Sequence, residues 1–351
     1  MNFYAVGKNK NSRALNKMIM ISKIQETPTD ENDVINYPTI IKKFPWLVQK
    51  DQNCIISPDS DGLLCGLFVS NHLNWKIRGF YDGKVMLLEK DFNIKDCIFL
   101  DMEIFRKEIR SVGQHMVMFN KNGLPENWNN FDNCFSANNT RGYGFKPNFP
   151  QKYPLATIHL LLGVLGSVQE VVIPKTAICP LLYTDGTFKN LFNYPDNCLS
   201  WLNFLQANNI ESPLHTIFFN DHYSIFSLMS ALSELFDELR SITGGKRGGD
   251  KIKLSNGKGE LVHFDKKTQN IELDTVKQAE KFLHILANKT GWNYSSEKWS
   301  WKNLSHFSFK KGTMTPSKGR YDKLMTNNPV SFAITSTFGI EYTIDTDGFL
   351  E

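Results

Sequence analysis

Residues 54–66 read CIISPDSDGLLCG and form the first unit of a predicted α/β fold. An apolar run, CIIS, leads into two aspartates, Asp59 and Asp61, and the following LLCGLFVSNHLN has apolar residues at helical spacing. The pattern predicts a short buried strand, a turn and a helix. A turn needs only one polar residue and a glycine, whereas a site for a divalent cation needs several oxygen ligands.

Further short apolar runs follow this unit. WKIRGF (75–80), VMLL (85–88), DCIFL (96–100) and HMVMF (115–119) predict strands, while MEIFRKEIR (102–110) and PLATIHLLLGVLGSV (154–168) predict helices. A polar, Asn- and Gly-rich stretch over 120–150 predicts a loop. Alternation of short strands with helices is typical of an α/β fold with a parallel sheet.

A glycine-rich basic stretch, TGGKRGGDK (243–251), has no apolar periodicity and predicts a linker or loop. We therefore expect four parts along the chain. A helical extension covers 1–50, a parallel-sheet catalytic domain covers 51–242, the linker covers 243–252, and a smaller α+β domain covers 253–351.

The composition is that of a globular protein, with 41% hydrophobic and 13% aromatic residues in 351. The longest apolar run, at 158–166, is too short to span a bilayer, and the N-terminus lacks the pattern of a signal peptide. The six cysteines include no CxxC pair, which favours reduced, buried thiols over a zinc site. We therefore expect a cytoplasmic protein without a membrane partner.

The basic residues are unevenly distributed. The segment 241–323 holds 17 Lys and Arg against 8 Asp and Glu, although the whole chain has a net charge of only +4. Such a segment suits a polyanionic ligand, but a solvated lysine-rich surface has the same composition.

Acidic side chains follow three apolar runs of the predicted sheet. Asp59 and Asp61 follow CIIS, Asp101 follows CIFL, and Asp185 follows ICPLLY, while His115 lies beside MVMF. Ligands of open parallel sheets bind at the carboxyl ends of the strands, where these side chains would converge. Four carboxylates and one imidazole suit Mn²⁺ or Mg²⁺ better than zinc. Each residue taken alone is also typical of a turn, a helix cap or a structural histidine.

Several of these segments resemble the motifs of a known family. SPDSDGLLCG resembles motif I of the DHH phosphoesterases, the superfamily of RecJ-like exonucleases, nanoRNases, cyclic-di-AMP phosphodiesterases and family II pyrophosphatases. IFLDMEI resembles motif II, a strand that ends in a metal-bridging Asp, and YTDGTF resembles motif IV. SVGQHMV stands where the Asp-His-His of motif III belongs, and the motifs occur in the family's order over residues 53–200.

The resemblance implies two Mn²⁺ or Mg²⁺ ions. By position, it implies five metal ligands, namely Asp59, Asp61, Asp101, His115 and Asp185. Asp101 is the implied bridge, and Asp101 and His115 are the implied catalytic residues. His115 falls on the last His of motif III, which in the family faces the substrate phosphate or the second metal, and Gln114, an expected substrate-binding residue, falls on the first.

Two departures from the family pattern affect these expectations. Relatives carry a His or a further Asp shortly before the motif I aspartates, where this chain has Ile55 and Ser57. Motif III reads Gly-Gln-His, so an orienting aspartate and one imidazole are missing. We therefore expect one of the two metal sites to be weak or absent.

Two segments are candidates for substrate binding. Lys246 and Arg247 lie between glycine pairs that let a backbone approach an anion, although a solvated linker would look the same. In the segment 138–154 three basic residues alternate with three aromatic ones, a pattern that suits a nucleic-acid backbone and stacked bases but also an ordinary surface loop; the residues are Arg141, Lys146 and Lys152 with Tyr143, Phe145 and Tyr153.

Three functions are consistent with the sequence. The first is a metal-dependent phosphoesterase, a hydrolase that cleaves a phosphodiester in an oligonucleotide or nucleotide. The second is a nucleotide- or nucleic-acid-binding protein with a degraded catalytic site, which the thinned motif III allows. The third is a phosphoanhydride hydrolase such as a pyrophosphatase.

Overall fold

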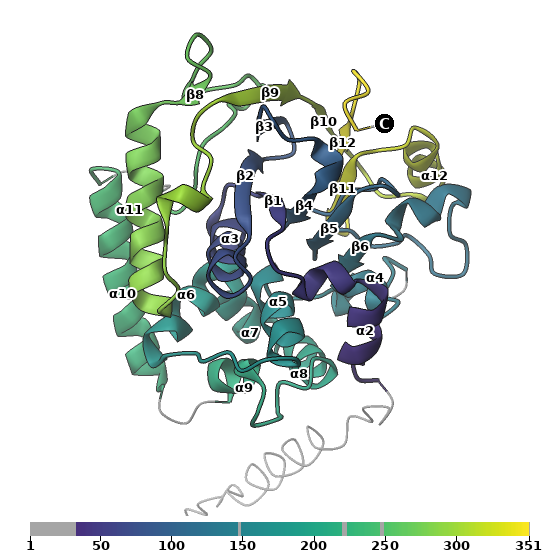
Figure 1. The fold of residues 1–351 in the computed structure, drawn as a ribbon. Coiled ribbons are helices and arrows are strands. Elements are labelled where there is room, and N and C mark those ends of the chain that lie inside the picture. Colours follow the sequence, from purple (N-terminus) through teal and green to yellow (C-terminus); the bar gives the residue numbers. More distant parts are fainter. Residues whose placement is uncertain (1–32, 147–148, 220–222, 246–248, 351) are drawn as a thin grey trace, which may run out of the picture. The chain divides into compact units, whose positions relative to one another are not determined.

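Seven strands among the described residues form one sheet in the order β6-β5-β4-β1-β2-β3-β9 (Figure 1). The computed structural model describes residues 33–146, 149–219, 223–245 and 249–350, and Ile35–Glu351 group into one compact unit. The first five strands in that order are parallel, and β3 and β9 are antiparallel to their neighbours. The strands are β1 Asn53–Ile56, β2 Lys76–Tyr81, β3 Val85–Glu89, β4 Cys97–Leu100, β5 Arg110–Gly113, β6 Cys134–Ser136 and β9 Leu304–Ser308. The predicted α/β fold is thereby confirmed.

Successive residues of β1 pack on opposite faces of the sheet, as the period of a strand requires. Cys54 and Ile56 belong to the main apolar cluster, which the helices cover. Ile55 belongs to a second cluster with Phe309 and Val330, so the C-terminal part of the chain covers the other face. Burial on both faces explains why the strand reads as an unbroken apolar run.

The helices cover the face of the sheet that carries the main cluster. Helix α3 contacts β1, β2 and β4, and it packs against α5 and α11, while α10 and α11 run side by side (Figure 1). No helix in the described part of the chain is both long and apolar enough to cross a membrane. The helices are α2 Tyr37–Lys43, α3 Ser60–His72, α4 Ala137–Thr140, α5 Thr157–Gly166, α6 Ile178–Tyr183, α7 Thr187–Asn193, α8 Pro195–Phe204, α9 Pro213–Phe218, α10 Ile225–Ile242, α11 Leu273–Thr290 and α12 Lys318–Thr326.

The chain after the glycine-rich stretch returns to the main sheet. Strand β9 pairs with β3, and a three-stranded antiparallel sheet, β10-β12-β11, follows it. Its strands are β10 Lys310–Met314, β11 Ser331–Ser336 and β12 Gly339–Ile344, and β7 Phe264–Asp265 with β8 Asn270–Ile271 forms a small ribbon. The domain division at 243–252 stays a prediction, while the segment after it completes the sheet begun before it.

Several expected elements differ from the observed ones. Residues 102–110 form no helix, because Met102 and Phe105 donate their N–H groups to Val112 and Val330 outside the segment. The predicted strand at 115–119 is wrong, since β5 lies upstream at Arg110–Gly113. The predicted loop over 120–150 contains β6 and α4.

The run ICPLLY is helix α6, so the prediction that Asp185 follows a strand is also wrong. A short apolar run of this length fits a buried helix as well as a buried strand, and periodicity alone does not separate them.

Candidate metal centre

Three of the predicted site residues follow the carboxyl ends of neighbouring strands. Asp59 lies between β1 and α3, Asp101 directly follows β4, and His115 lies two residues beyond β5. Because β1, β4 and β5 are adjacent and parallel, their ends meet at one edge of the sheet. Asp185 reaches the same place from the helical layer, in a short 3-10 turn between α6 and α7.

Asp101, His115 and Asp185 form a group that could hold a metal ion. Each offers one ligand atom, and these atoms all lie within 4.8 Å of one another. The His115 Nε2 atom is 3.6 Å from the Asp101 Oδ1 atom. The Asp101 side chain is 1% exposed and that of His115 is 39% exposed, while Asp185 is exposed. The group is thus buried at Asp101 and open to solvent at His115 and Asp185.

Both aspartates of this group have unusual backbone conformations. The φ angle is +60° at Asp101 and +51° at Asp185, in the left-handed region that residues other than glycine seldom adopt. Asp and Asn tolerate this region better than most residues, at a cost of about 1 kcal/mol. Such local strain is common at functional sites, where the surrounding structure fixes the direction of a side chain.

Hydroxyl and amide groups orient these carboxylates. The Ser57 Oγ atom lies 2.6 Å from Asp101 Oδ2 and 2.8 Å from Asp59 Oδ1, and Thr157 Oγ1 donates to Asp101 Oδ1 at 2.7 Å. Gln114 Nε2 donates to Asp185 Oδ2. The sequence did not single out Thr157 for the site, because a threonine that begins a helix is common and its contact is with a residue 56 positions away.

The two motif I aspartates have different partners. Asp59 is the N-cap of α3, and its Oδ1 atom accepts the N–H groups of Asp61 and Gly62, each at 3.2 Å. Asp61 is fully buried, and its two oxygens accept the N–H groups of Thr157 (2.6 Å) and Ile158 (3.1 Å). Asp61 therefore caps α5 from outside that helix and lies outside the group of three ligand atoms.

A glycine permits the close approach of α3 to the strand end. A Cβ atom at Gly62 would lie 2.2 Å from the Ser57 carbonyl oxygen and 2.3 Å from its Oγ atom. Only glycine fits there without moving Ser57, the residue whose hydroxyl contacts two of the site carboxylates.

Crowding of the carboxylates changes their pKa values. Desolvation of the carboxyl groups, together with the charge of Asp101, raises the pKa of Asp59 to about 6 and that of Asp185 to about 7, although the Asp185 residue as a whole is exposed. Desolvation and the same neighbour also raise the pKa of Asp61. The metal-free group therefore retains protons because its carboxyl groups are desolvated and their negative charges repel one another, and a divalent cation would relieve that repulsion.

Asp101 and His115 behave as an ion pair within this group. Burial alone would raise the pKa of Asp101, but the hydrogen bond to His115 and the hydroxyls of Ser57 and Thr157 hold it below its usual value. Burial alone would lower the pKa of His115, but Asp101 raises it to about 9. A metal ion that binds His115 would therefore have to displace the proton that the imidazole holds beside Asp101.

We expect Mn²⁺ affinity to increase by at least about tenfold between pH 5.5 and 7.5, since binding to Asp185 and His115 must displace their protons. The folded-state pKa values of the Asp59 and Asp185 carboxyls lie above their unfolded values. The metal-free protein should therefore lose stability as the pH rises from about 4 through 7. Titration calorimetry at matched ionic strength measures the first effect and urea unfolding in chelator the second. An affinity that stays constant over this range would contradict the assignment of the ligands.

A cleft of about 590 Å³ adjoins this centre. Asp59, Asp101 and His115 line it together with side chains of the three-stranded sheet, including Phe332 and Tyr342. Four lysines also line it, of which Lys311 is paired with Glu341 at 2.7 Å. The other three are Lys84, Lys251 and Lys253. The cleft thus combines carboxylates, amines and aromatic rings, as a site for a phosphorylated ligand would.

The remaining sequence candidates lie in different surroundings. The Arg141 guanidinium lies over the rings of Tyr143 and Trp201 and donates to Ser200 Oγ at 2.9 Å. The Lys146 Nζ atom is 5.7 Å from the centre of the Phe119 ring. Neither residue lines the cleft beside the metal centre. Lys246 and Arg247 lie outside the described residues.

Lys152 is the third basic residue of the predicted basic and aromatic segment. Its Nζ atom donates to the Ile334 carbonyl at 3.3 Å. Burial lowers the pKa of Lys152, and the charges of Glu103 and Asp185 oppose that shift, which places it within electrostatic reach of the site. Basic and aromatic residues alternate around it in the sequence, but nothing in that pattern distinguishes Lys152 from Lys146.

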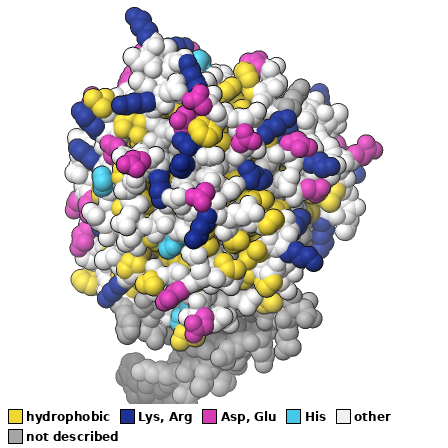
Figure 2. Space-filling view, viewed as in Figure 1, with side chains coloured by type: hydrophobic (Ala, Val, Ile, Leu, Met, Phe, Trp, Pro, Cys, Tyr) yellow, Lys and Arg dark blue, Asp and Glu magenta, His cyan; other side chains and the backbone are white. Residues whose placement is uncertain are grey.

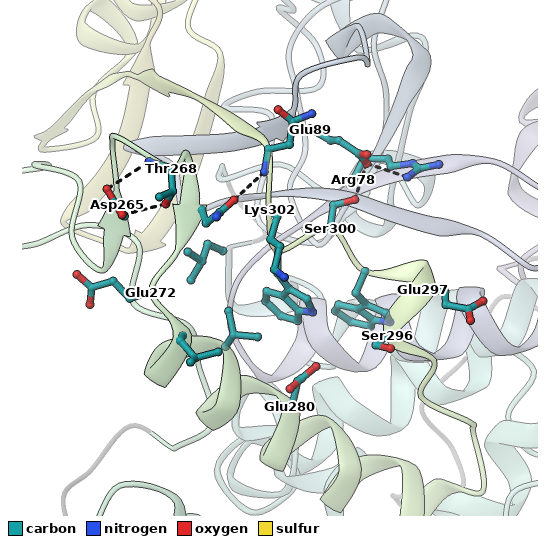
Figure 3. A pocket seen from close by; sticks show the side chains of 17 residues that line it. Arg78, Glu89, Asp265, Thr268, Glu272, Glu280, Ser296, Glu297, Ser300 and Lys302 are labelled. Atoms are coloured by element: carbon teal, nitrogen blue, oxygen red, sulfur yellow. Dashed lines mark hydrogen bonds and ion pairs between the residues drawn. The ribbon is translucent and has the colours of Figure 1, made fainter.

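A second cleft, of about 920 Å³, lies near the opposite ends of the strands (Figure 3). Arg78 pairs with Glu89 at 2.7 Å, and Ser300 donates to the same carboxylate. Glu272, Glu280 and Glu297 add further acidic side chains around it (Figure 3). It contains none of the predicted site residues. Figure 2 shows Lys and Arg interspersed with Asp and Glu on the face drawn, without a continuous basic track there.

Comparison with known proteins adds no relative. No protein-family model, curated protein or solved structure matches this chain.

Proposed function

We propose that this chain is a metal-dependent phosphoesterase that hydrolyses a phosphodiester in an oligonucleotide or nucleotide. The observation that carries the proposal is the convergence of Asp101, His115 and Asp185, with ligand atoms within 4.8 Å. The resemblance of the sequence motifs to the DHH phosphoesterases points to the same chemistry.

The donor set supports Mn²⁺ or Mg²⁺ as the ion. Two carboxylates and one imidazole are mostly hard oxygen ligands. Three ligands suit one ion. A second ion would need Asp59, since the oxygens of Asp61 already accept two backbone N–H groups.

A divalent ion at this centre would supply Lewis-acid activation of a phosphoryl group and of an attacking water. The protein's part is to hold the ligands and the substrate. Ser57 and Thr157 fix the Asp101 carboxylate by hydrogen bonds, and the His115 imidazole faces it from the open side. The lysines of the cleft provide cations for the non-reacting phosphates of a substrate.

One observation favours a second function, a nucleotide-binding protein without turnover. Gln114 stands where an imidazole ligand would complete the site, and it is bound to Asp185. Two of the ligands that the motifs imply are therefore missing, since Gln114 replaces an imidazole and Asp61 caps α5. A binding protein tolerates such a loss more readily than an enzyme.

Hydrolysis assays separate these functions. We expect the purified protein with Mn²⁺ to hydrolyse bis-p-nitrophenyl phosphate and a labelled oligonucleotide, and to lose that activity in chelator. Release of phosphate from pyrophosphate alone would instead identify a phosphoanhydride hydrolase. Oligonucleotide binding without turnover under Mn²⁺, Mg²⁺ or Co²⁺ would overturn the enzyme proposal in favour of the binding protein.

A further inference from the structure

Glu103 is a buried acidic residue next to the metal centre. Its side chain is 2% exposed, and its Oε2 atom accepts the backbone N–H groups of His115 at 2.8 Å and of Met116 at 3.0 Å. The carboxylate thus bridges the segment after β4 to the turn after β5. A hydrogen bond from a neutral donor to a charged acceptor is among the stronger ones in proteins.

The backbone on both sides of Glu103 is fixed to β5. The Met102 N–H donates to the Val112 carbonyl at 3.2 Å, and the Ile104 N–H donates to Ser111 Oγ at 3.1 Å. The Glu103 side chain therefore starts from a defined position and is not a mobile loop residue.

The Glu103 side chain occupies the space that a side chain at position 113 would need. A Cβ atom at Gly113 would lie 2.7 Å from Glu103 Cγ and 2.8 Å from its Cδ atom. Gly113 is not among the glycines with a positive φ angle, so its backbone conformation does not require glycine. The absence of a side chain at 113 is explained by the presence of the one at 103.

An aspartate at position 113 would be placed to make the same hydrogen bonds. Aspartate side chains commonly accept backbone N–H groups two and three residues later, as in Asx turns and helix N-caps. From position 113 those donors are the N–H groups of His115 and Met116, which Glu103 binds here. Glu103, in the segment after β4, therefore supplies the carboxylate acceptor that an aspartate at position 113 would supply from within the turn.

We propose that Glu103 is the positioning residue of His115. Its carboxylate fixes the turn at 113–116, and the turn aims the imidazole at Asp101 and Asp185. The proposal rests on the proposed function only in that His115 is taken to hold a metal ion. The carbonyl groups of the turn have their own anchor, because Asn138 Nδ2 donates to the Gln114 carbonyl at 2.7 Å. Loss of Glu103 should therefore loosen the turn without unfolding the sheet edge.

The test removes the carboxylate at position 103 and introduces one at position 113. In Glu103→Ala, Mn²⁺ affinity should fall by about 10- to 100-fold, as for other residues that orient a ligand. Glu103→Gln keeps an oxygen acceptor and should retain most of the affinity. The double variant Glu103→Ala with Gly113→Asp should recover most of what Glu103→Ala loses, whereas Gly113→Asp alone should be destabilised by its contact with Glu103.

Hydrogen exchange of the metal-free proteins gives a second readout that does not depend on activity or metal. The amides of residues 115 and 116 should lose protection in Glu103→Ala and regain it in the double variant. If Glu103→Ala fails to fold and the double variant folds, the result also supports the proposal, because a carboxylate at position 113 then replaces the one at position 103 as acceptor of the two N–H groups. A double variant that is no better than Glu103→Ala in both readouts would overturn the proposal. Wild-type protein that binds no Mn²⁺, yet shows the expected exchange pattern, would overturn the proposed function alone.

Discussion

The Asp101→Asn variant is expected to lose at least about 10³-fold of the Mn²⁺-dependent hydrolysis of bis-p-nitrophenyl phosphate, which corresponds to several kcal/mol of lost transition-state stabilisation. Asp101 contributes to the group of three ligand atoms, and its pKa is held below the usual value, so it is ionised when the ion binds. An amide of the same size does not carry the charge that offsets the cation.

Asparagine is the informative replacement at this position. It tolerates the φ angle of +60° that Asp101 adopts, so the backbone is preserved and the loss reports on charge. The matched control is Asp96→Asn, since Asp96 is an exposed residue directly before β4, the strand that Asp101 follows. The control should keep wild-type turnover. Full turnover in Asp101→Asn, measured with saturating Mn²⁺, would remove Asp101 from the mechanism.

The second large effect is on stability. Asp61→Ala should lower the free energy of unfolding of the metal-free protein by about 3 kcal/mol, since it leaves two buried N–H donors without an acceptor. Those donors belong to the first residues of α5, whose N-cap residue, Ala156, makes no side-chain cap hydrogen bond. Urea unfolding in chelator measures this effect without a contribution from metal binding.

A second acidic residue at a helix start gives the comparison. Asp196 lies in the first turn of α8 and is exposed, so Asp196→Ala should cost less than about 1 kcal/mol. Metal-free stability that is unchanged in Asp61→Ala, together with complete loss of Mn²⁺ binding, would identify Asp61 as a ligand, as the motif resemblance implies.

Much of the sheet could be predicted because its strands are buried on both faces and read as short apolar runs between turns. The runs at Cys54–Ile56 and Cys97–Leu100 were predicted as strands because they are short and Asp or Asn residues stand close to both ends. The same rule failed for ICPLLY, which is equally apolar but packs as helix α6 against other helices. Composition alone does not reveal what covers an apolar segment.

The candidate site was predictable where its residues follow strand ends. Order along the chain brings Asp101 and His115 together once the sheet is known to be parallel. Asp185 comes from the helical layer, so its approach depends on how the helices pack and not on strand topology. The sequence predicted Asp185 as a site residue on the ground that it follows a strand, and that ground is wrong because it follows helix α6.

The supporting residues could not be predicted, because their partners are far away in sequence. Thr157 contacts Asp101 across 56 positions, and Asp61 caps a helix that begins 96 residues later. Glu103 stands two residues after Asp101, yet its role appears only when Gly113 is seen to lack the space for a side chain. Such contacts depend on the folded positions of two loops.

The most direct test of the metal centre is a crystal soaked in MnCl₂ and measured at the manganese absorption edge. We predict one strong anomalous peak within about 2.2 Å of a carboxylate oxygen of Asp101, of a nitrogen of His115 and of a carboxylate oxygen of Asp185. An empty map at this position under saturating Mn²⁺, or a manganese ion bound only elsewhere, would contradict the proposed metal centre.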